Sequence, residues 1–347
     1  MHGCKMTGTE ISNSATAERI EQLRALLRTI SPPFSPGDKI GIKLHWGERG
    51  NTSFLPPQYA REIVRWLKGL GVRPFVFDTT VLYSGGRRNG LDSLATAAMH
   101  GYTPEYLGCP VVIGDGLDGM AVMDIPSGFR HFDTVQVGRV LEWANGFVIF
   151  SHFKGHLVAG FGGAVKNISM GFASRAQKQR MHADVQPQLI EEKCIKCGIC
   201  ARVCPAGAVE FSPGNYPKFN LDRCIGCAQC IGSCPQVAIK VQWNADKFIF
   251  QERLVETAAA VWRIIAGRTV LINAAVHISR DCDCMPGENP IIGKDVGFFA
   301  GYHPVDLDWK TLQAVGEDIF RKAHPNVPFM RQFSFAKEIG FCGGNLS

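Results

Sequence analysis

Apolar and polar positions along the chain change in blocks that predict helices and strands in turn. Segments with apolar residues three and four apart alternate with short apolar runs of strand length. The pattern predicts helices over 16–30, 57–70, 91–100, 254–266 and 305–319. It predicts strands over 39–44, 73–78, 110–113, 146–150, 269–273 and 296–300.

Such alternation is typical of an α/β fold, in which a mostly parallel sheet has helices on both faces. It resumes after a cysteine-rich middle segment, so we expect a small α+β ferredoxin-like domain that interrupts one α/β domain. The predicted parts are a loose N-terminus without periodicity (1–15), the first part of the α/β domain (16–187), the ferredoxin-like domain (188–245) and the second part of the α/β domain (246–347).

Eight of the 13 cysteines form two copies of the motif C-x2-C-x2-C-x3-C-P. In the bacterial ferredoxin motif with this spacing, three thiolates of one copy bind one cubane [4Fe-4S] cluster and the fourth binds the other cluster. The motif therefore predicts two [4Fe-4S] clusters, one held by Cys194, Cys197, Cys200 and Cys234, the other by Cys224, Cys227, Cys230 and Cys204. Zinc is the alternative, but a zinc ribbon has two C-x2-C pairs separated by a long spacer.

Composition and charge exclude several classes of protein. With 46% hydrophobic and 20% charged residues, the chain is typical of globular proteins rather than disordered ones. The net charge of +6 comes without a block of Lys or Arg, so nucleic acid is not an expected partner. No apolar run has the length of a membrane span, and the first residues lack the apolar region of a secretory signal. We therefore expect a cytoplasmic protein without a membrane span.

Polar side chains follow three of the predicted strands, where ligands bind in α/β sheets. His45 follows the first strand, Asp78 ends the second, and the segment 152–156 follows the strand that ends at Phe150. Each residue alone is better explained as an ordinary loop residue, but three such strand ends together predict a shared cleft. Its candidate cofactor-binding residues are Lys154, Gly162, Gly163, His45 and Asp78.

The glycine-rich segment 160–171 predicts a helix entry at which backbone N–H groups face an anion. The alternative is a glycine-rich helix entry with basic surface residues and no ligand. Neither a G-x-G-x-x-G fingerprint nor a P-loop is present, which argues against the two common nucleotide sites.

Across nearly its whole length, the chain resembles the DUF362 family of iron–sulfur proteins. The resemblance rests on the strings at 39–43, 77–79, 154–156, 162–167, 281–284, 295–297 and 303–308. Members commonly carry two ferredoxin motifs, so the resemblance implies this fold and these clusters, whereas the family's reaction is undefined. His45 stands where many members have Pro-Asn, so this corner of the cleft is not carried over from the family.

The segment 156–166 is also similar to the glycine-rich segment of nickel-pincer lactate racemases. His156 and His182 stand at the same intervals from Lys166 as two histidines of those enzymes stand from their cofactor lysine. The resemblance implies that Lys166 holds a cofactor, His156 shuttles protons and His182 ligates a metal. These three are the candidate catalytic residues. Racemases of that kind need no ferredoxin clusters, so this is the less favoured interpretation.

Five cysteines lie outside the ferredoxin motifs. Cys282 and Cys284 would share one face of an extended segment, where they bind a further metal, form a redox-active pair, or are ordinary small buried residues. Cys342 is a possible third member of this group, whereas Cys4 and Cys109 are expected to be inert or exposed.

Two classes of function fit these observations. In the first, the protein is a ferredoxin-linked oxidoreductase whose clusters pass electrons to a small anionic substrate or a further cofactor in the cleft. A cationic cleft formed by Lys43, His45, Lys154, His156, Lys166 and Arg175 favours such a substrate. In the second, the protein is an electron-transfer adaptor that docks on a redox partner protein. The pattern determines neither the substrate nor the oligomeric state.

Overall fold

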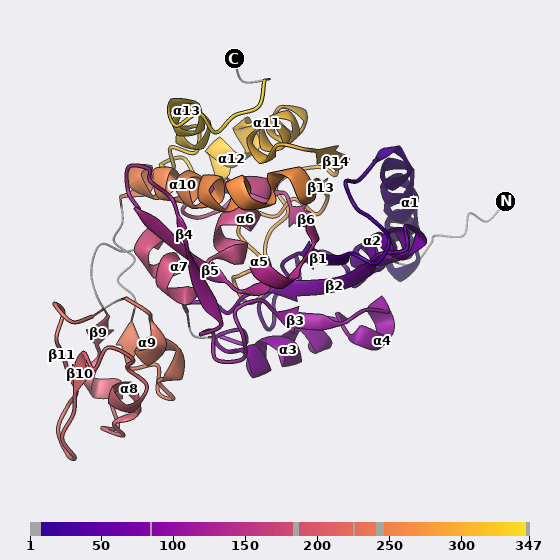
Figure 1. The fold of residues 1–347 in the computed structure, drawn as a ribbon. Helices are drawn as coiled ribbons and strands as arrows, with labels where there is room; N and C mark the ends of the chain where they lie inside the picture. The colour runs from indigo at the N-terminus through magenta and orange to yellow at the C-terminus, as the bar shows by residue number, and fades with distance from the viewer. Residues whose placement is uncertain (1–7, 84, 183–186, 225, 241–245, 345–347) are drawn as a thin grey trace.

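The centre of the protein is a six-stranded sheet with the strand order β14-β13-β6-β1-β2-β3 (Figure 1). The computed structural model describes residues 8–83, 85–182, 187–224, 226–240 and 246–344. The strands are β1 (Lys39–Lys43), β2 (Arg73–Asp78), β3 (Val111–Ile113), β6 (Gly146–His152), β13 (Thr269–Ala275) and β14 (Gly297–Gly301). All neighbours in the sheet are parallel except β13 and β14, which confirms the predicted mostly parallel α/β fold.

Helices cover both faces of the sheet because strand side chains alternate between them. On β6, Phe147 and Ile149 belong to one apolar core, and Val148 and Phe150 belong to the other. The second core is covered by α1 (Gly8–Thr29), α2 (Pro57–Gly69), α3 (Gly90–Met99) and α4 (Pro104–Leu107). The first is covered by α5 (Val140–Trp143), α6 (Ala164–Phe172), α7 (Arg175–His182), α10 (Lys247–Ile265), α11 (Pro304–Val315), α12 (Asp318–Ala323) and α13 (Arg331–Glu338).

Several elements differ from the pattern-based prediction. The helix predicted over 305–319 is two helices, because Gly316 between α11 and α12 has φ +90°, which a helix cannot accommodate. Helix α10 begins earlier than predicted because Asp246 caps it, accepting hydrogen bonds from the N–H groups of Phe248 and Ile249. Two hairpins were not predicted, β4 (Val122–Pro126) with β5 (Thr134–Gly138) and β7 (Lys154–His156) with β8 (Gly160–Gly162).

The cysteine-rich segment projects from the α/β part beside α7 and β5 (Figure 1). It contains α8 (Ile199–Arg202), α9 (Gln229–Ser233), a 3-10 turn (Glu191–Lys193), and two small antiparallel sheets, β9 (Gln188–Leu189) with β12 (Ile239–Lys240) and β10 (Val209–Glu210) with β11 (Lys218–Phe219). The domain boundaries themselves stay a prediction. The predicted end at 245 and residues 1–7 of the predicted loose N-terminus lie outside the described residues. Among those residues, no helix combines the length and the apolar character needed to cross a membrane.

Candidate functional site

A cavity of about 1000 Å³ opens at the carboxyl ends of β1, β2 and β6. From β1 the chain order runs through β2 to β3 on one side, and from β6 to β13 on the other. The carboxyl ends of β1 and β6 therefore form a topological switch point, where α/β sheets bind their ligands. The structure brings the candidate catalytic residues, the candidate cofactor-binding residues and the cysteine pair to the wall of this cavity, namely His45, Asp78, Lys154, His156, Gly162, Gly163, Lys166, His182, Cys282 and Cys284.

A buried network of charges occupies the wall formed by β1 and β2. Lys43 Nζ lies 2.9 Å from Asp78 Oδ1, and Arg87 Nη1 lies 3.0 Å from Asp78 Oδ2. Arg87 Nε is 3.4 Å from Glu48 Oε2. Asp78 therefore balances two protein cations, which is a different task from the predicted contact with a cofactor. Burial lowers the pKa of Lys43, although Asp78 opposes this effect.

On another wall of the cavity, Asp283 contacts the side chains of His152 and Lys154. Its Oδ2 lies 2.9 Å from His152 Nδ1 and 3.0 Å from Lys154 Nζ, and its side chain is fully buried. Burial acts to lower the pKa of Lys154, but Asp283 and Cys282 more than offset it, so the pKa of Lys154 is raised. Lys154 is therefore a fixed cation whose charge the neighbouring carboxylate balances.

Cys282 and Cys284 lie in a turn rather than in the predicted extended segment. The N–H of Met285 donates to the carbonyl of Cys282 at 2.9 Å, which closes the turn. The two sulfur atoms and a ring nitrogen of His156 nevertheless lie within 4.8 Å of one another. Lys166 Nζ is 3.7 Å from Cys282 Sγ. A hydrogen bond from Cys284 holds the pKa of Cys282 well below its usual value, and Lys166 adds to this against the effect of burial.

The backbone decides which ring nitrogen of His156 carries a proton. Its Nδ1 accepts hydrogen bonds from the N–H groups of Val158 at 3.1 Å and Ala159 at 2.9 Å. A neutral His156 must then carry its proton on Nε2. Metal-bound histidines instead donate from the second ring nitrogen to an acceptor. His156 is therefore suited to donate a hydrogen bond to the Cys282 sulfur and unsuited to ligate a metal through Nε2.

The N-terminus of α6 is occupied by a protein carboxylate. Asp308 Oδ1 accepts from the N–H of Ala164 at 2.7 Å, and Asp308 Oδ2 from that of Val165 at 2.9 Å. We expected these N–H groups to face an anion. The group that they face is the carboxylate of Asp308, which belongs to the chain itself and is not a ligand. Gly163 is needed here for close approach, and Gly162 lies against the Lys166 side chain.

We expect Gly163→Ala to lower the free energy of unfolding by about 1–3 kcal/mol, the usual cost of overpacking. A Cβ at Gly163 would lie 2.3 Å from Asp308 Oδ1, so the cap of α6 would have to shift. Urea unfolding measures the effect. In the matched control Gly267→Ala the new Cβ meets nothing within 4 Å, so equal midpoints for the two variants would contradict this role of Gly163.

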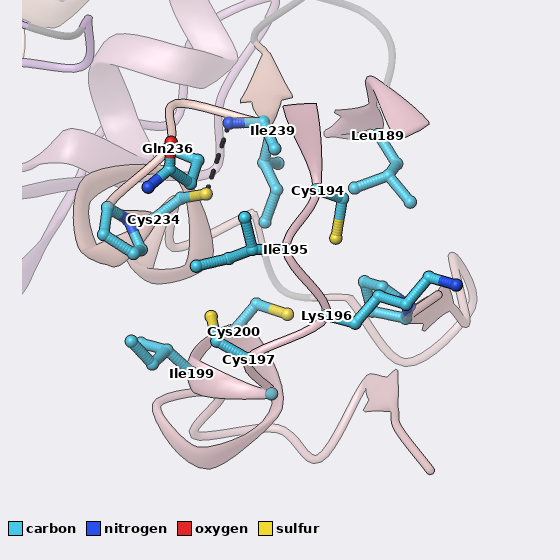
Figure 2. Close-up of a pocket in the computed structure, with 14 residues that line it drawn as sticks. Leu189, Cys194, Ile195, Lys196, Cys197, Ile199, Cys200, Cys234, Gln236 and Ile239 are labelled. Atoms are coloured by element: carbon cyan, nitrogen blue, oxygen red, sulfur yellow. Dashed lines mark hydrogen bonds between the residues drawn. The ribbon is translucent and has the colours of Figure 1, made fainter. Parts of the chain in front are cut away.

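The cysteines of the first predicted cluster share one pocket, whereas the grouping of the second set stays a prediction. Cys194, Cys197 and Cys200 line one small pocket together with Cys234 from the second motif (Figure 2). Burial raises the pKa of Cys227, and the nearby Cys204 and Cys224 raise it further. None of the described cysteines forms a disulfide. The donor set is therefore thiols alone, as a cubane cluster requires.

Backbone donors complete these two groups symmetrically. The N–H of Ala238 donates to Cys234 Sγ at 3.2 Å, drawn as a dashed line in Figure 2, and the N–H of Ala208 donates to Cys204 Sγ at the same distance. Hydrogen bonds to cluster sulfurs tune the reduction potential of iron–sulfur clusters. The chemistry of both donor sets thus fits [4Fe-4S] clusters.

A family model described as "Domain of unknown function (DUF362)" matches residues 40–313. The chain belongs to the DUF362 family. No curated protein matches it. Two solved structures are similar: the lactate racemase apoprotein from Thermoanaerobacterium thermosaccharolyticum (13% identity, TM-score 0.40, 82% of this chain) and a protein from Thermotoga maritima (11% identity, TM-score 0.45, 88% of this chain). The chain covers 52% of the first and 57% of the second.

In this DUF362 protein, Arg175 does not reach the cavity, contrary to expectation. Its guanidinium donates to the carbonyl of Arg88 at 3.1 Å and contacts Gln229 of α9. Burial lowers the pKa of Arg175, whereas Asp115 and Cys227 act in the opposite direction. Arg175 therefore fastens the cysteine-rich segment to the α/β part on the side of the second motif.

Leu82, in the loop after β2, lies between the two groups of candidate residues. It is buried in the small apolar core that contains Cys200, Cys230 and Cys234, and it also lines the large cavity. No sequence pattern marks Leu82, Arg87 or Glu48, because each lies in a loop and acts on residues far away in the chain. Of the remaining described cysteines, neither Cys109 nor Cys342 lines the cavity, and burial raises the pKa of Cys109 to about 11. Cys4 lies outside the described residues.

We expect His156 and His182 of this DUF362 protein to stay neutral between about pH 5 and 8, the range in which histidine usually titrates. Burial lowers the pKa of His156 to about 4 and Lys166 adds to this, while burial lowers the pKa of His182 to about 3. A histidine with a depressed pKa remains uncharged above that pKa, so the NMR signals of both rings should not shift in this range. In urea the same signals should titrate with a pKa of about 6.5. If the signals of the folded protein also shift between about pH 5 and 8, burial does not keep these histidines neutral.

Proposed function

We propose that this DUF362 protein is an iron–sulfur oxidoreductase with two [4Fe-4S] clusters that pass electrons to a small anionic substrate in the large cavity. Cys194, Cys197, Cys200 and Cys234 would hold one cluster, and Cys224, Cys227, Cys230 and Cys204 the other. Bound clusters would supply low-potential one-electron chemistry.

The observation that carries the proposal is the position of Leu82. One side chain belongs both to the core around the motif cysteines and to the wall of the cavity. The side of the second motif that carries Cys227 and Cys230 faces the α/β part, because Gln229 of α9 contacts Arg175 and both cysteines act to raise the pKa of Arg175 against the effect of burial. The cluster held by Cys224, Cys227 and Cys230 would therefore be the one nearer to the substrate.

The charge of the cavity supports an anionic substrate. The carboxylates of Asp78, Glu48 and Asp283 already balance Lys43, Arg87 and Lys154. Among the described residues, Lys166 has no carboxylate partner, and its ammonium contacts only Cys282 Sγ at 3.7 Å. Lys166 is thus a cation well placed to meet a carboxylate or phosphate, and a pincer cofactor on this lysine would displace its contact with Cys282.

Two measurements test the proposal. Protein purified without oxygen should contain about eight irons per chain and give the EPR signal of reduced cubane clusters. A panel of carboxylates and phosphates is then added to the reduced protein, and we expect at least one compound to accelerate reoxidation of the clusters.

The variant Lys166→Ala should lose that acceleration but keep its iron, whereas the exposed control Lys337→Ala should behave as the parent protein. If no compound accelerates reoxidation and Lys166→Ala matches the parent, the protein is an electron-transfer adaptor. An iron content near zero after reconstitution would refute both functions.

A further inference from the structure

We propose that Cys282 and Cys284 form a redox-active dithiol–disulfide pair that collects two electrons at the wall of the cavity. The inference rests on the proposed function, because iron–sulfur clusters carry electrons singly and most small organic substrates accept them in pairs. A dithiol between the clusters and the substrate would join the two kinds of chemistry.

The contacts of Asp283 hold the turn that carries the pair in place. The side chain of Asp283, between the two cysteines, contacts His152, Lys154 and, at 3.4 Å, the hydroxyl of Ser53. These contacts hold Asp283, which does not itself line the cavity, while Cys282 and Cys284 do. Two sulfur atoms within 4.8 Å of each other on a two-residue spacing need only a small movement to form a bond.

Cys282, Cys284 and His156 are less well suited to bind a metal than the two cysteines are to form a disulfide. In the part of the chain that the structure describes, the only third ligand near the two sulfurs is His156. Its Nδ1 accepts two backbone hydrogen bonds, so Nε2 carries the proton and has no lone pair for a metal. Two sulfurs alone leave a thiolate site for zinc two ligands short of the usual four.

The surroundings make the two thiols unequal, as thiol–disulfide exchange requires. Lys166 Nζ at 3.7 Å and the Nε2–H of His156 both face Cys282 and stabilise a thiolate there. The hydrogen bond with Cys282 raises the pKa of Cys284, and burial raises it further, so Cys284 keeps its proton. Cys282 is thus the attacking or leaving thiolate, and Cys284 is the thiol that carries the proton.

One short stretch of chain links this pair to the ferredoxin motifs. Leu82 is part of the core around Cys200, Cys230 and Cys234, and its neighbour Tyr83 lines the cavity. Burial raises the pKa of Tyr83, and Cys284 is among the nearby groups that raise it further. Consecutive residues therefore approach both groups of cysteines.

Reduction of the Cys282–Cys284 disulfide takes two electrons and one proton. Two electrons from a low-potential one-electron donor protein and one proton break the S–S bond, leaving a thiolate on Cys282 and a thiol on Cys284. In the reverse direction the pair gives two electrons to the oxidised substrate, the S–S bond forms again, and the proton leaves Cys284.

Alkylation followed by mass spectrometry of the peptide that contains both cysteines tests the inference directly. Anaerobic protein with its clusters verified by iron content and EPR is treated with the thiol oxidant diamide, and one half is then reduced with titanium(III) citrate. In the oxidised half we expect the peptide to be unalkylated and lighter by two hydrogens, and in the reduced half to be alkylated at both cysteines.

Variants make the result specific. Cys342→Ser should behave as the parent, whereas Cys284→Ser should leave Cys282 open to alkylation in both halves. Intact clusters with Cys282 and Cys284 fully alkylated in the oxidised half would overturn the inference and leave the proposed function standing. So would thiols protected in both halves together with a stoichiometric extra metal. Absence of clusters would instead refute the proposed function.

Discussion

The double variant Cys224→Ser/Cys227→Ser is expected to hold about four irons per chain instead of about eight, because it lacks two of the four ligands of one cubane cluster. In the proposed function, the cluster that it loses would be the one nearer to the α/β part, since α9 contacts Arg175 while α8 lies farther away (Figure 1). The remaining cluster should still be reduced by a donor, but reoxidation by a substrate in the cavity should be lost.

The reciprocal variant Cys194→Ser/Cys197→Ser is the matched control. It should also lose about half of the iron. If the proposed order is right, its remaining cluster is the one nearer to the cavity, so a small reductant should still support reoxidation by the substrate. Equal loss of substrate-dependent reoxidation in the two variants would contradict the order in which the clusters are placed.

The crossed ligands allow a sharper comparison. Cys204 belongs to the first motif in sequence but is predicted to bind the same cluster as Cys224 and Cys227. The EPR spectrum of Cys204→Ala should therefore resemble that of Cys224→Ser/Cys227→Ser. A spectrum like that of Cys194→Ser/Cys197→Ser would show that each motif binds its own cluster.

The second large effect concerns stability. Asp78→Ala is expected to lower the free energy of unfolding by about 3–5 kcal/mol, the usual cost of removing one partner from a buried ion pair. Asp78 is the carboxylate that both Lys43 and Arg87 contact, and the side chains of all three are at most 5% exposed. Without it, two cations stay buried with only Glu48 and neutral oxygens near them.

Urea unfolding of the iron-loaded protein measures this loss, with the iron content determined for each variant. Asp78→Asn should lose less, since its amide oxygen can still accept from one cation. Glu142→Ala breaks the exposed pair with Arg139 and should cause no measurable change. If Asp78→Ala proves as stable as Glu142→Ala, the network does not contribute to folding as the structure indicates.

Local patterns predicted much of the fold. Strand β2 has the predicted bounds, and the other sheet strands differ only at their ends. The two unpredicted hairpins include very short strands: β7 and β8 alternate no apolar residues and are held by pairing with each other. The break at Gly316 was equally invisible, because the apolar spacing continues across it.

The candidate site was only partly predictable. Lys154, Lys166 and Cys282 were identified from strand ends, a glycine-rich segment and a short cysteine spacing, and all of them line the cavity. Asp308, which caps α6, stands 144 positions from Ala164 in the chain, and no local pattern joins them. The proton position on His156 depends on two backbone N–H groups, so it follows from the turn after β7 and not from the residue type.

By itself the sequence determined the family, the alternation of strands and helices, and two cysteine motifs whose spacing sets which thiols reach one cluster. These are local properties, because periodicity and loop length act between residues close in the chain. Only the tertiary structure decided that Asp78 and Asp283 balance protein cations, that Asp308 takes the N-terminus of α6, and that Leu82 joins the motif cysteines to the cavity. Such contacts bring together residues from distant segments, and burial then determines which charges must be paired.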